Sequence, residues 1–315
     1  MIAVVVMFFS FDVSLTELWE YITKAGYWLA AILGLWCVLY LMNAWAWRVI
    51  IQGGGPCMVG FMQLLKLTVS GFALNYVTPV GLMGGEPYRI MELTSYVGVE
   101  RATSSVILYV MMHIFSHFCF WLSSVLIYVF FYPVGWGMGI VLGLITLFCL
   151  LLVTLFIKGY RNGMAVACVR LGSHIPFLKK HAVRFAELHK EKLETIDSQI
   201  ALLHQQRKST FYSALGLEYT ARIVGCLEVW LILNVLTTDV SFVGCILIVA
   251  FSSLLANLLF FLPMQLGGRE GGFALAVAGL SLSGAYGVFA ALITRVREMV
   301  WIVIGLVLMK IGNRK

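Results

Sequence analysis

Charged residues are scarce in this chain. They make up 12% of its 315 residues, whereas hydrophobic residues make up 61%, and the mean hydropathy is +0.94. Soluble domains contain about 45–50% apolar residues, so this composition excludes a soluble globular protein. The length suits about eight spans of ~20 residues and one polar loop, with no room for a second, soluble domain. We expect an all-α polytopic membrane protein with a single membrane domain, residues 1–315.

Motifs for common enzyme chemistry are also missing. The chain has only three Asp residues and no Asp-x-Asp pair that would hold a metal and a sugar nucleotide. It has neither a Gly-x-Ser-x-Gly elbow nor a glycine-rich phosphate loop ending in Lys-Ser or Lys-Thr. We therefore predict no catalytic residue and no cofactor.

Metal-binding patterns are absent too. The cysteines form no Cys-x-x-Cys pair and have no His at ligand spacing, so they are interpreted as packing residues. His113 and His117 have the i, i+4 spacing of two ligands, but a metal site needs a third and a fourth. Hydrogen bonding between membrane helices is the favoured interpretation of this pair, and no metal site is predicted.

The apolar runs predict eight spans. Their approximate bounds are Tyr27 to Ile51, Phe61 to Val80, Ala102 to Tyr132, Trp136 to Ile157, Phe211 to Leu236, Ser241 to Leu262, Phe273 to Ile293 and Val296 to Ile311. They fall into two halves, 27–157 and 209–311, on either side of a polar loop at 158–208. The apolar segment from Met1 to Phe11 lacks a basic start and a cleavage site, so it is interpreted as a truncated span or an interfacial helix.

The polar loop predicts the orientation. It carries ten Lys or Arg against four Asp or Glu, and so supplies +6 of the net charge of +7. By the positive-inside rule the loop is cytoplasmic, and counting spans from it places both termini inside. Its segment from Phe177 to Arg207 resembles an amphipathic helix that lies on the inner leaflet, or else it only sets the topology. Because orientation explains the basic excess, no nucleic-acid partner is expected.

What the chain does have is a duplicated motif. Pro79 and Pro263 are each followed by Leu at the third residue, Gly at the fifth and Glu at the seventh, and each has an Asn shortly upstream. Pro and paired Gly break a membrane helix, and a Glu beside the break is costly unless it serves something. The motif predicts a substrate site built from two broken helices. Its residues are Asn75, Pro79, Gly84, Gly85, Glu86, Arg89, Asn257, Pro263, Gly267, Gly268, Arg269 and Glu270.

Further charges inside the apolar runs extend this predicted polar path. Glu218 and Arg222 share one helix face, with Glu228 further along the same run. Arg295 and Glu298 can meet at i, i+3, and form either an outer gate or an anchor at the interface. Arg295 and Arg297 fall near an outer turn, against the positive-inside rule, so either they are functional or the last two spans are misplaced.

Two arrangements of the halves remain open. The eight-span count puts both breaks at the inner ends of the second and sixth spans, which gives two four-span repeats related by an axis along the membrane normal. If an apolar run is instead a re-entrant hairpin, the break moves toward mid-membrane and the repeat becomes inverted.

At these breaks the chain resembles a known family. Asn75, Thr78 and Pro79 before the Gly-Gly-Glu-Pro-Tyr-Arg segment at 84–89, and Pro263 through Gly272 after the basic loop, look like the flippase-like membrane domain of lysylphosphatidylglycerol synthases. The resemblance covers nearly the whole chain. It implies a multi-span inner-membrane protein that moves polar lipids between leaflets. The soluble domain that makes the lipid is missing, so the resemblance implies no lipid synthesis.

The residues and the resemblance together favour a flippase whose cargo is an anionic phospholipid or an isoprenoid-linked lipid. Arg89 and Arg269 are the expected phosphate ligands, beside the N–H groups of a helix start. Glu86 and Glu270 can hold these Arg side chains, receive an amine or carry a proton. The alternatives are a scaffold for a separate lipid-modifying or glycosyl-transferring enzyme, an intramembrane enzyme that uses Glu86 or Glu270 as a base, and plain turn formation by the Gly and Pro residues.

Overall fold

The structure is a computed structural model, and it describes residues 23, 26–56, 59–78, 84–162, 208–237, 240–258, 268–280 and 282–311. These residues form helices joined by short turns, with no strand among them. The helices are α3 (Tyr27–Gly53), α4 (Phe61–Val77), α5 (Gly85–Val97), α6 (Val99–Phe131), α7 (Trp136–Asn162), α11 (Lys208–Leu233), α12 (Phe242–Leu258), α13 (Gly268–Gly279) and α14 (Gly284–Ile311).

Long and short helices alternate in a fixed order. A long helix is followed by a short pair and another long helix, first as α3, α4, α5 and α6, and again as α11, α12, α13 and α14. The members of the short pairs have 12 to 17 residues, fewer than the ~20 that cross a bilayer. Three described helices are long and apolar enough to span a membrane, namely α3, α6 and residues 136–157 of α7. The helices α11 and α14 have similar lengths but carry charges.

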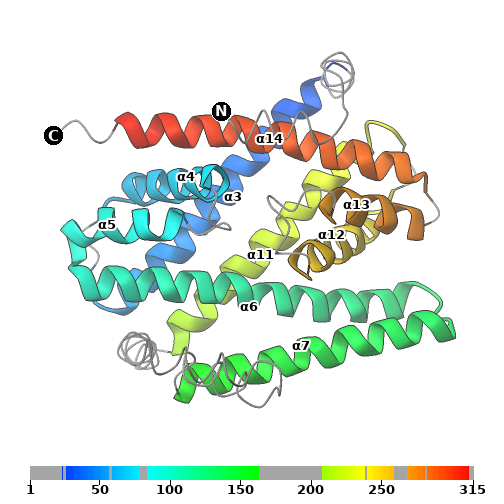
Figure 1. The fold of residues 1–315 in the computed structure, drawn as a ribbon, viewed down its shortest axis with the longest axis horizontal. Coiled ribbons are helices and arrows are strands. Elements are labelled where there is room, and N and C mark those ends of the chain that lie inside the picture. The colour runs from blue at the N-terminus through cyan, green and yellow to red at the C-terminus, as the bar shows by residue number, and fades with distance from the viewer. Residues whose placement is uncertain are drawn as a thin grey trace, which may run out of the picture.

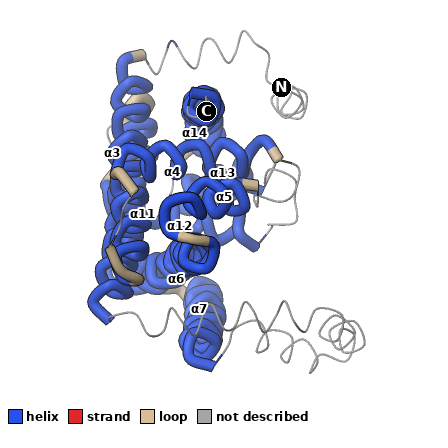
Figure 2. The backbone as a smooth tube through the Cα atoms, turned by 90° about the vertical axis from the view of Figure 1, so that its left-hand side faces the viewer, coloured by secondary structure: helices blue, strands red, loops and turns tan. Residues whose placement is uncertain are grey.

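The short pairs lie at opposite ends of the molecule. Figure 1 shows α4 and α5 in the left half and α12 and α13 in the right half, all between α14 and α6. The pair α4/α5 starts and finishes at the end where α6 begins, and α12/α13 starts and finishes at the end where α14 begins. Figure 2 shows α3 and α11 along one side of this stack, with α7 outside α6.

The packing follows the same order in both halves. The first part of α6 packs on α5 and its later part on α12, while the first part of α14 packs on α13 and its later part on α4. Each short pair has its own apolar core. One core contains Leu64, Leu93 and Met112, and the other contains Val277, Ile248 and Phe289. Neither pair therefore depends on the other for its apolar contacts.

A glycine and an arginine fix the turns at the end of the molecule where α6 begins. Gly98 has φ of +82° between α5 and α6, a conformation that glycine adopts without strain, and it lets the chain reverse there. Arg101, in the first turns of α6, donates from Nη2 to the carbonyl oxygens of Ile51 (2.7 Å) and Gly55 (2.6 Å) at the end of α3. Arg101 thus satisfies acceptors that a helix end leaves free.

The structure corrects the predicted spans. The predicted boundary between Ile293 and Val296 is wrong, because α14 runs through it without interruption from Gly284 to Ile311. The run that was expected to start at Phe273 is divided at Gly279 between α13 and α14. A helix start was expected at the first break, where α5 begins, but α5 was not among the predicted runs, since its sequence is too polar to stand out as an apolar run. Arg295 and Arg297 therefore lie inside a helix rather than beside an outer turn.

Other expectations fall outside the described residues. These are the segment from Met1 to Phe11, the amphipathic helix after Phe177 and the C-terminal Lys315.

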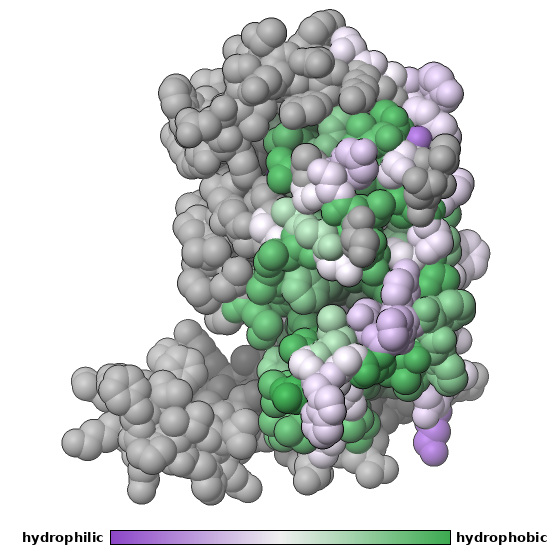
Figure 3. Space-filling model, turned by 90° about the vertical axis from the view of Figure 1, so that its right-hand side faces the viewer, coloured by the Kyte–Doolittle hydropathy of each residue, from purple (hydrophilic) through white to green (hydrophobic). Residues whose placement is uncertain are grey.

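The right-hand side of the molecule as drawn in Figure 1 faces the viewer in Figure 3, and its described surface is mostly apolar with scattered polar residues. Cysteines 37, 119, 149, 226 and 245 are free.

Glycines of α14 allow close approach to both short pairs, which yields a prediction. A Cβ on Gly287 would lie 2.5 Å from the Phe273 carbonyl oxygen, and one on Gly305 would lie 2.7 Å from that of Val69. Gly287→Ala and Gly305→Ala should each lower the free energy of unfolding by about 1–3 kcal/mol, since backbone must move to make room. Thermal unfolding of the purified protein in detergent would measure the loss.

Gly34→Ala in α3 is the matched control, because the added Cβ meets nothing within 4 Å. It should leave stability unchanged or raise it by up to about 1 kcal/mol through helix propensity. If the α14 variants behave like this control, the close contacts are not what holds α14 in place.

Candidate functional site

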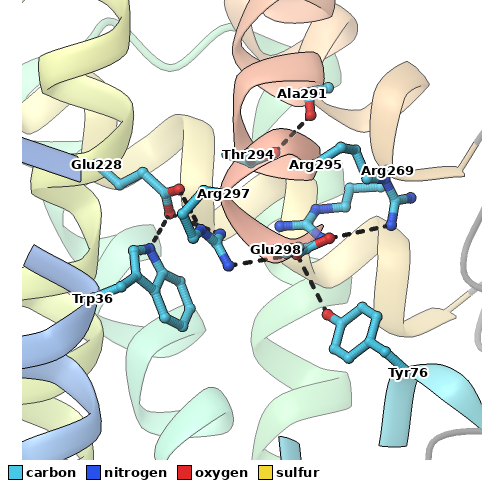
Figure 4. A network of polar contacts seen from close by, with 9 residues as sticks. All are labelled: Trp36, Tyr76, Glu228, Arg269, Ala291, Thr294, Arg295, Arg297 and Glu298. Atoms are coloured by element: carbon cyan, nitrogen blue, oxygen red, sulfur yellow. Dashed lines mark hydrogen bonds and ion pairs between the residues drawn. The ribbon is translucent and has the colours of Figure 1, made fainter. Parts of the chain in front are cut away.

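The largest group of buried charges surrounds Glu298 of α14. Arg269 of α13 donates to its Oε1 atom through Nη1, the Tyr76 hydroxyl of α4 donates to Oε1 at 3.3 Å, and Arg295 Nη1 lies 3.4 Å from Oε2. Figure 4 shows these side chains converging from three helices. The Glu298 side chain is only 4% exposed, so its charge depends on these partners.

A second carboxylate extends the group to α11 and α3. Arg297 donates to both oxygens of Glu228, from Nε at 2.8 Å and from Nη2 at 3.1 Å, and the Trp36 indole donates to Glu228 Oε2 at 2.8 Å. The Arg297 guanidinium also lies 3.6 Å from the centre of the Trp36 ring (Figure 4). Its Nη1 atom lies 3.7 Å from Glu298 and has no hydrogen-bond partner among the described residues. We call Trp36, Tyr76, Glu228, Arg269, Arg295, Arg297 and Glu298 the central network.

The first break is closed by Asn75. Its Oδ1 atom accepts from the Gly85 N–H at 2.6 Å, and its Nδ2 atom donates to Glu86 Oε1 at 3.1 Å. Asn75 is in the last turn of α4, so its side chain satisfies the free N–H at the start of α5. A Cβ on Gly85 would collide with the Gly71 carbonyl oxygen, which explains why glycine stands there. The neighbouring Tyr76 then links this break to the central network.

Arg89 lies in the first turns of α5 and is buried against α4, close to the first break. It donates to the carbonyl oxygens of Leu67 at 3.5 Å and Thr68 at 3.1 Å, and its Nη1 lies 3.7 Å from Glu86. A side chain on Gly71 would occupy the same space. The guanidinium also lies over the rings of Trp47 and Tyr109. These contacts hold Arg89 between α4 and Glu86, and its contact with phosphate stays a prediction.

A third polar group joins α6 to α11. His113 Nδ1 lies 2.8 Å from Glu218 Oε2, so the predicted interhelical hydrogen bonding by this histidine is confirmed. Arg222 donates to Ser116 Oγ at 2.6 Å and to the His113 carbonyl oxygen at 2.7 Å. Glu218 and Arg222 thus face α6 together, but each is paired with α6 rather than with the other.

The other predicted residues divide into three sets. Arg269 and Glu298 come together, and the expected contact of Arg295 with Glu298 is confirmed. Asn257 lies apart, since its Nδ2 atom donates to the Ser253 carbonyl oxygen of its own helix. The placement of Pro79, Pro263, Gly267 and the Glu270 side chain lies outside the described residues; Gly84 and Gly268 flank the breaks.

Sequence reasoning missed the aromatic members of the network. Trp36 and Tyr76 are unremarkable in an apolar run, and only their spatial neighbours give them a role. The interpretation of Arg295 and Glu298 as an interface anchor does not fit, because both side chains are 4% exposed. Among the described residues, no group of three or more His, Cys, Asp or Glu is placed to hold a metal.

The family model for the lysylphosphatidylglycerol synthase TM region matches residues 1–306. The chain belongs to this family. It is therefore a multi-pass membrane protein of a family in lipid metabolism or transport. No curated protein and no solved structure matches the chain.

The pairing of Glu228 with Arg297 yields the second prediction. Glu228→Ala should lower the free energy of unfolding by about 3–5 kcal/mol, because it leaves Arg297 charged and buried without its main partner. The double variant Glu228→Ala with Arg297→Leu should recover part of the loss, since no unpaired charge remains. Thermal unfolding in lipid nanodiscs would compare the three proteins.

Glu100→Ala is the control, because Glu100 is exposed in the first turn of α6 and its loss should cost no more than about 1 kcal/mol. Equal losses in the single and double variants would show that packing, and not charge pairing, gives this contact its importance.

Proposed function

We propose that the chain moves a polar lipid between the two leaflets of the cell inner membrane, with the headgroup passing between the two breaks. The observation that carries the proposal is the position of Glu298. It contacts the start of α13 through Arg269 and the end of α4 through Tyr76, so the two breaks meet at one carboxylate. Buried charges are costly in a membrane and are kept where polar cargo must pass.

Arg269 is the cation that cargo would reach first. Its side chain is 19% exposed, compared with 1% for Arg297 and 4% for Arg295. It lies in the first turn of α13, where free N–H groups and the helix dipole also favour an anion. A lipid phosphate would compete with Glu298 for the Arg269 guanidinium through charge-assisted hydrogen bonds of the same kind.

The helix order supports an inverted repeat as part of this proposal. Each helix of the two short pairs is too short to cross a bilayer, and the two pairs start from opposite ends of the molecule. We propose that they are re-entrant hairpins and that an axis in the membrane plane relates α3–α6 to α11–α14, as in many transporters. Lys208 and Lys310 are then at one end, which the positive-inside rule assigns to the cytoplasm, while α3 begins at the opposite end.

The first experiment is lipid translocation by the purified protein in vesicles. The wild type should move labelled anionic phospholipid from one leaflet to the other, while empty vesicles should not. In the proposal the chain performs no chemical step, so the mass of the lipid should stay the same. A change of lipid mass would favour an intramembrane enzyme, and neither movement nor change would favour a scaffold for a separate lipid-modifying enzyme.

The third prediction tests the headgroup contact. Arg269→Gln should weaken the apparent affinity for anionic lipid about tenfold to a hundredfold, because it removes a charge-assisted contact of about 1.5–3 kcal/mol. The matched control is Lys310→Gln, which removes one exposed positive charge from α14. Translocation at wild-type rates and affinity in Arg269→Gln would refute the assignment, and normal folding would be checked by gel filtration.

A further inference from the structure

The contact between His113 and Glu218 lies apart from the central network, and the proposed lipid path does not use it. His113 is in the middle of the 33-residue helix α6, and its side chain is 46% exposed. Glu218, from α11, is 1% exposed. The pair therefore joins an exposed imidazole ring to a buried carboxyl group.

Only one of the two carboxylate oxygens of Glu218 has a hydrogen-bond partner among the described residues. Its Oε2 atom is 2.8 Å from His113 Nδ1, but its Oε1 atom is buried and has no hydrogen-bond partner in the described part of the chain. Arg222, one turn away, directs its donors to Ser116 and to the His113 backbone instead. A buried carboxylate with an unpaired oxygen is unfavourable, and adding a proton removes the charge that causes the penalty.

Few other charged groups surround the pair. On α6 the neighbours are Tyr109 and His117, whose rings lie 6.5 Å and 5.5 Å from that of His113. Tyr109 is in turn within electrostatic reach of Arg222 on α11 and of Arg89 and Glu86 on α5.

Of the remaining helices packed against α6 and α11, α7 and α12 add no charge here, α3 carries Arg48, and α14 carries the charges of the central network. Between residues 136 and 157, α7 has no charged residue and no His, and α12 has no charged residue at all. The nearby polar contacts of α3 and α12 come from Trp47, which bonds Ser105, and from Ser253, which accepts from Trp121. No second carboxylate competes with Glu218 on these faces.

We propose that Glu218 and His113 form a proton-binding site whose occupancy is coupled to lipid movement. A hydronium ion donates its proton to His113 Nε2, which has no hydrogen bond to a described residue. The Nδ1 proton then passes to Glu218 Oε2, which leaves a neutral imidazole protonated at Nε2 and a neutral carboxylic acid. The net step moves one proton from a hydronium ion to Glu218, and release follows the same atoms in reverse.

The coupling has a physical route to the first break. The His113 ring packs on Tyr109, the Arg89 guanidinium lies 5.5 Å from the centre of the Tyr109 ring, and Arg89 lies beside Glu86 at the start of α5. Neutralising Glu218 removes a negative charge that attracts the Arg89 guanidinium. The coupling, unlike the proton site itself, rests on the proposed function.

The fourth prediction tests proton binding directly, without transport. Infrared difference spectra between alkaline and acidic buffer, on the full chain in nanodiscs, should show a carboxylic-acid carbonyl band that Glu218→Gln abolishes. Glutamine keeps the size of the side chain and an acceptor for His113. The control Glu100→Gln, an exposed residue of α6, should keep this band. His113→Gln should keep the band but slow its appearance, because the path for the proton is lost. Identical spectra from wild type and Glu218→Gln would overturn the site.

The coupling is tested in vesicles with an imposed pH gradient. Wild-type lipid movement should change with the direction of the gradient, and Glu218→Gln should move lipid at a rate that ignores it. Wild-type rates that ignore the gradient would overturn the coupling while leaving lipid movement intact. If the wild type moves no lipid under either gradient, the proposed function and the coupling both fall, and the infrared result alone decides the proton site.

Discussion

The Glu298 carboxylate is the contact on which the interior depends. It is buried in an apolar molecule, where an isolated charge is strongly unfavourable, and it is stabilised by arginines of α13 and α14 and by the Tyr76 hydroxyl of α4. Because those partners come from both short pairs and from the last long helix, one side chain links two short pairs that share no apolar core. The charges make the arrangement specific where apolar packing alone is not directional.

The central network also explains the helix lengths around it. A helix of 12 to 17 residues leaves backbone groups at its ends inside the molecule, and each such group needs a partner. At the first break the Asn75 side chain supplies one partner for Gly85, and at the second the charged Arg269 lies in the first turn of α13. The breaks leave backbone N–H and C=O groups at the helix ends inside the molecule. Polar and charged side chains lie between these ends.

The sequence predicted the class of the fold and the importance of the breaks, because composition and the Pro-Gly-Gly-Glu motif are local signals. It also predicted the contact of Arg295 with Glu298, which depends only on helical spacing. It predicted a helix start at the first break but not the extent of α5, whose polar sequence is hidden from hydropathy, and it did not predict the continuous α14, whose three central charges resemble a span boundary. The partners of Glu228 and Glu218 could not be found, since Trp36 and His113 lie 192 and 105 residues away in the chain.

The continuity of α14 has a mechanical consequence. This helix has 28 residues, so it extends about 42 Å. It touches the α13 backbone at Gly287 and the α4 backbone at Gly305, with Glu298 between these two points. An unbroken helix transmits a tilt from one contact to the other and absorbs little of it. A displacement of one short pair that tilts α14 therefore also changes the contacts of α14 with the other short pair. Glu298 lies between these two sets of contacts.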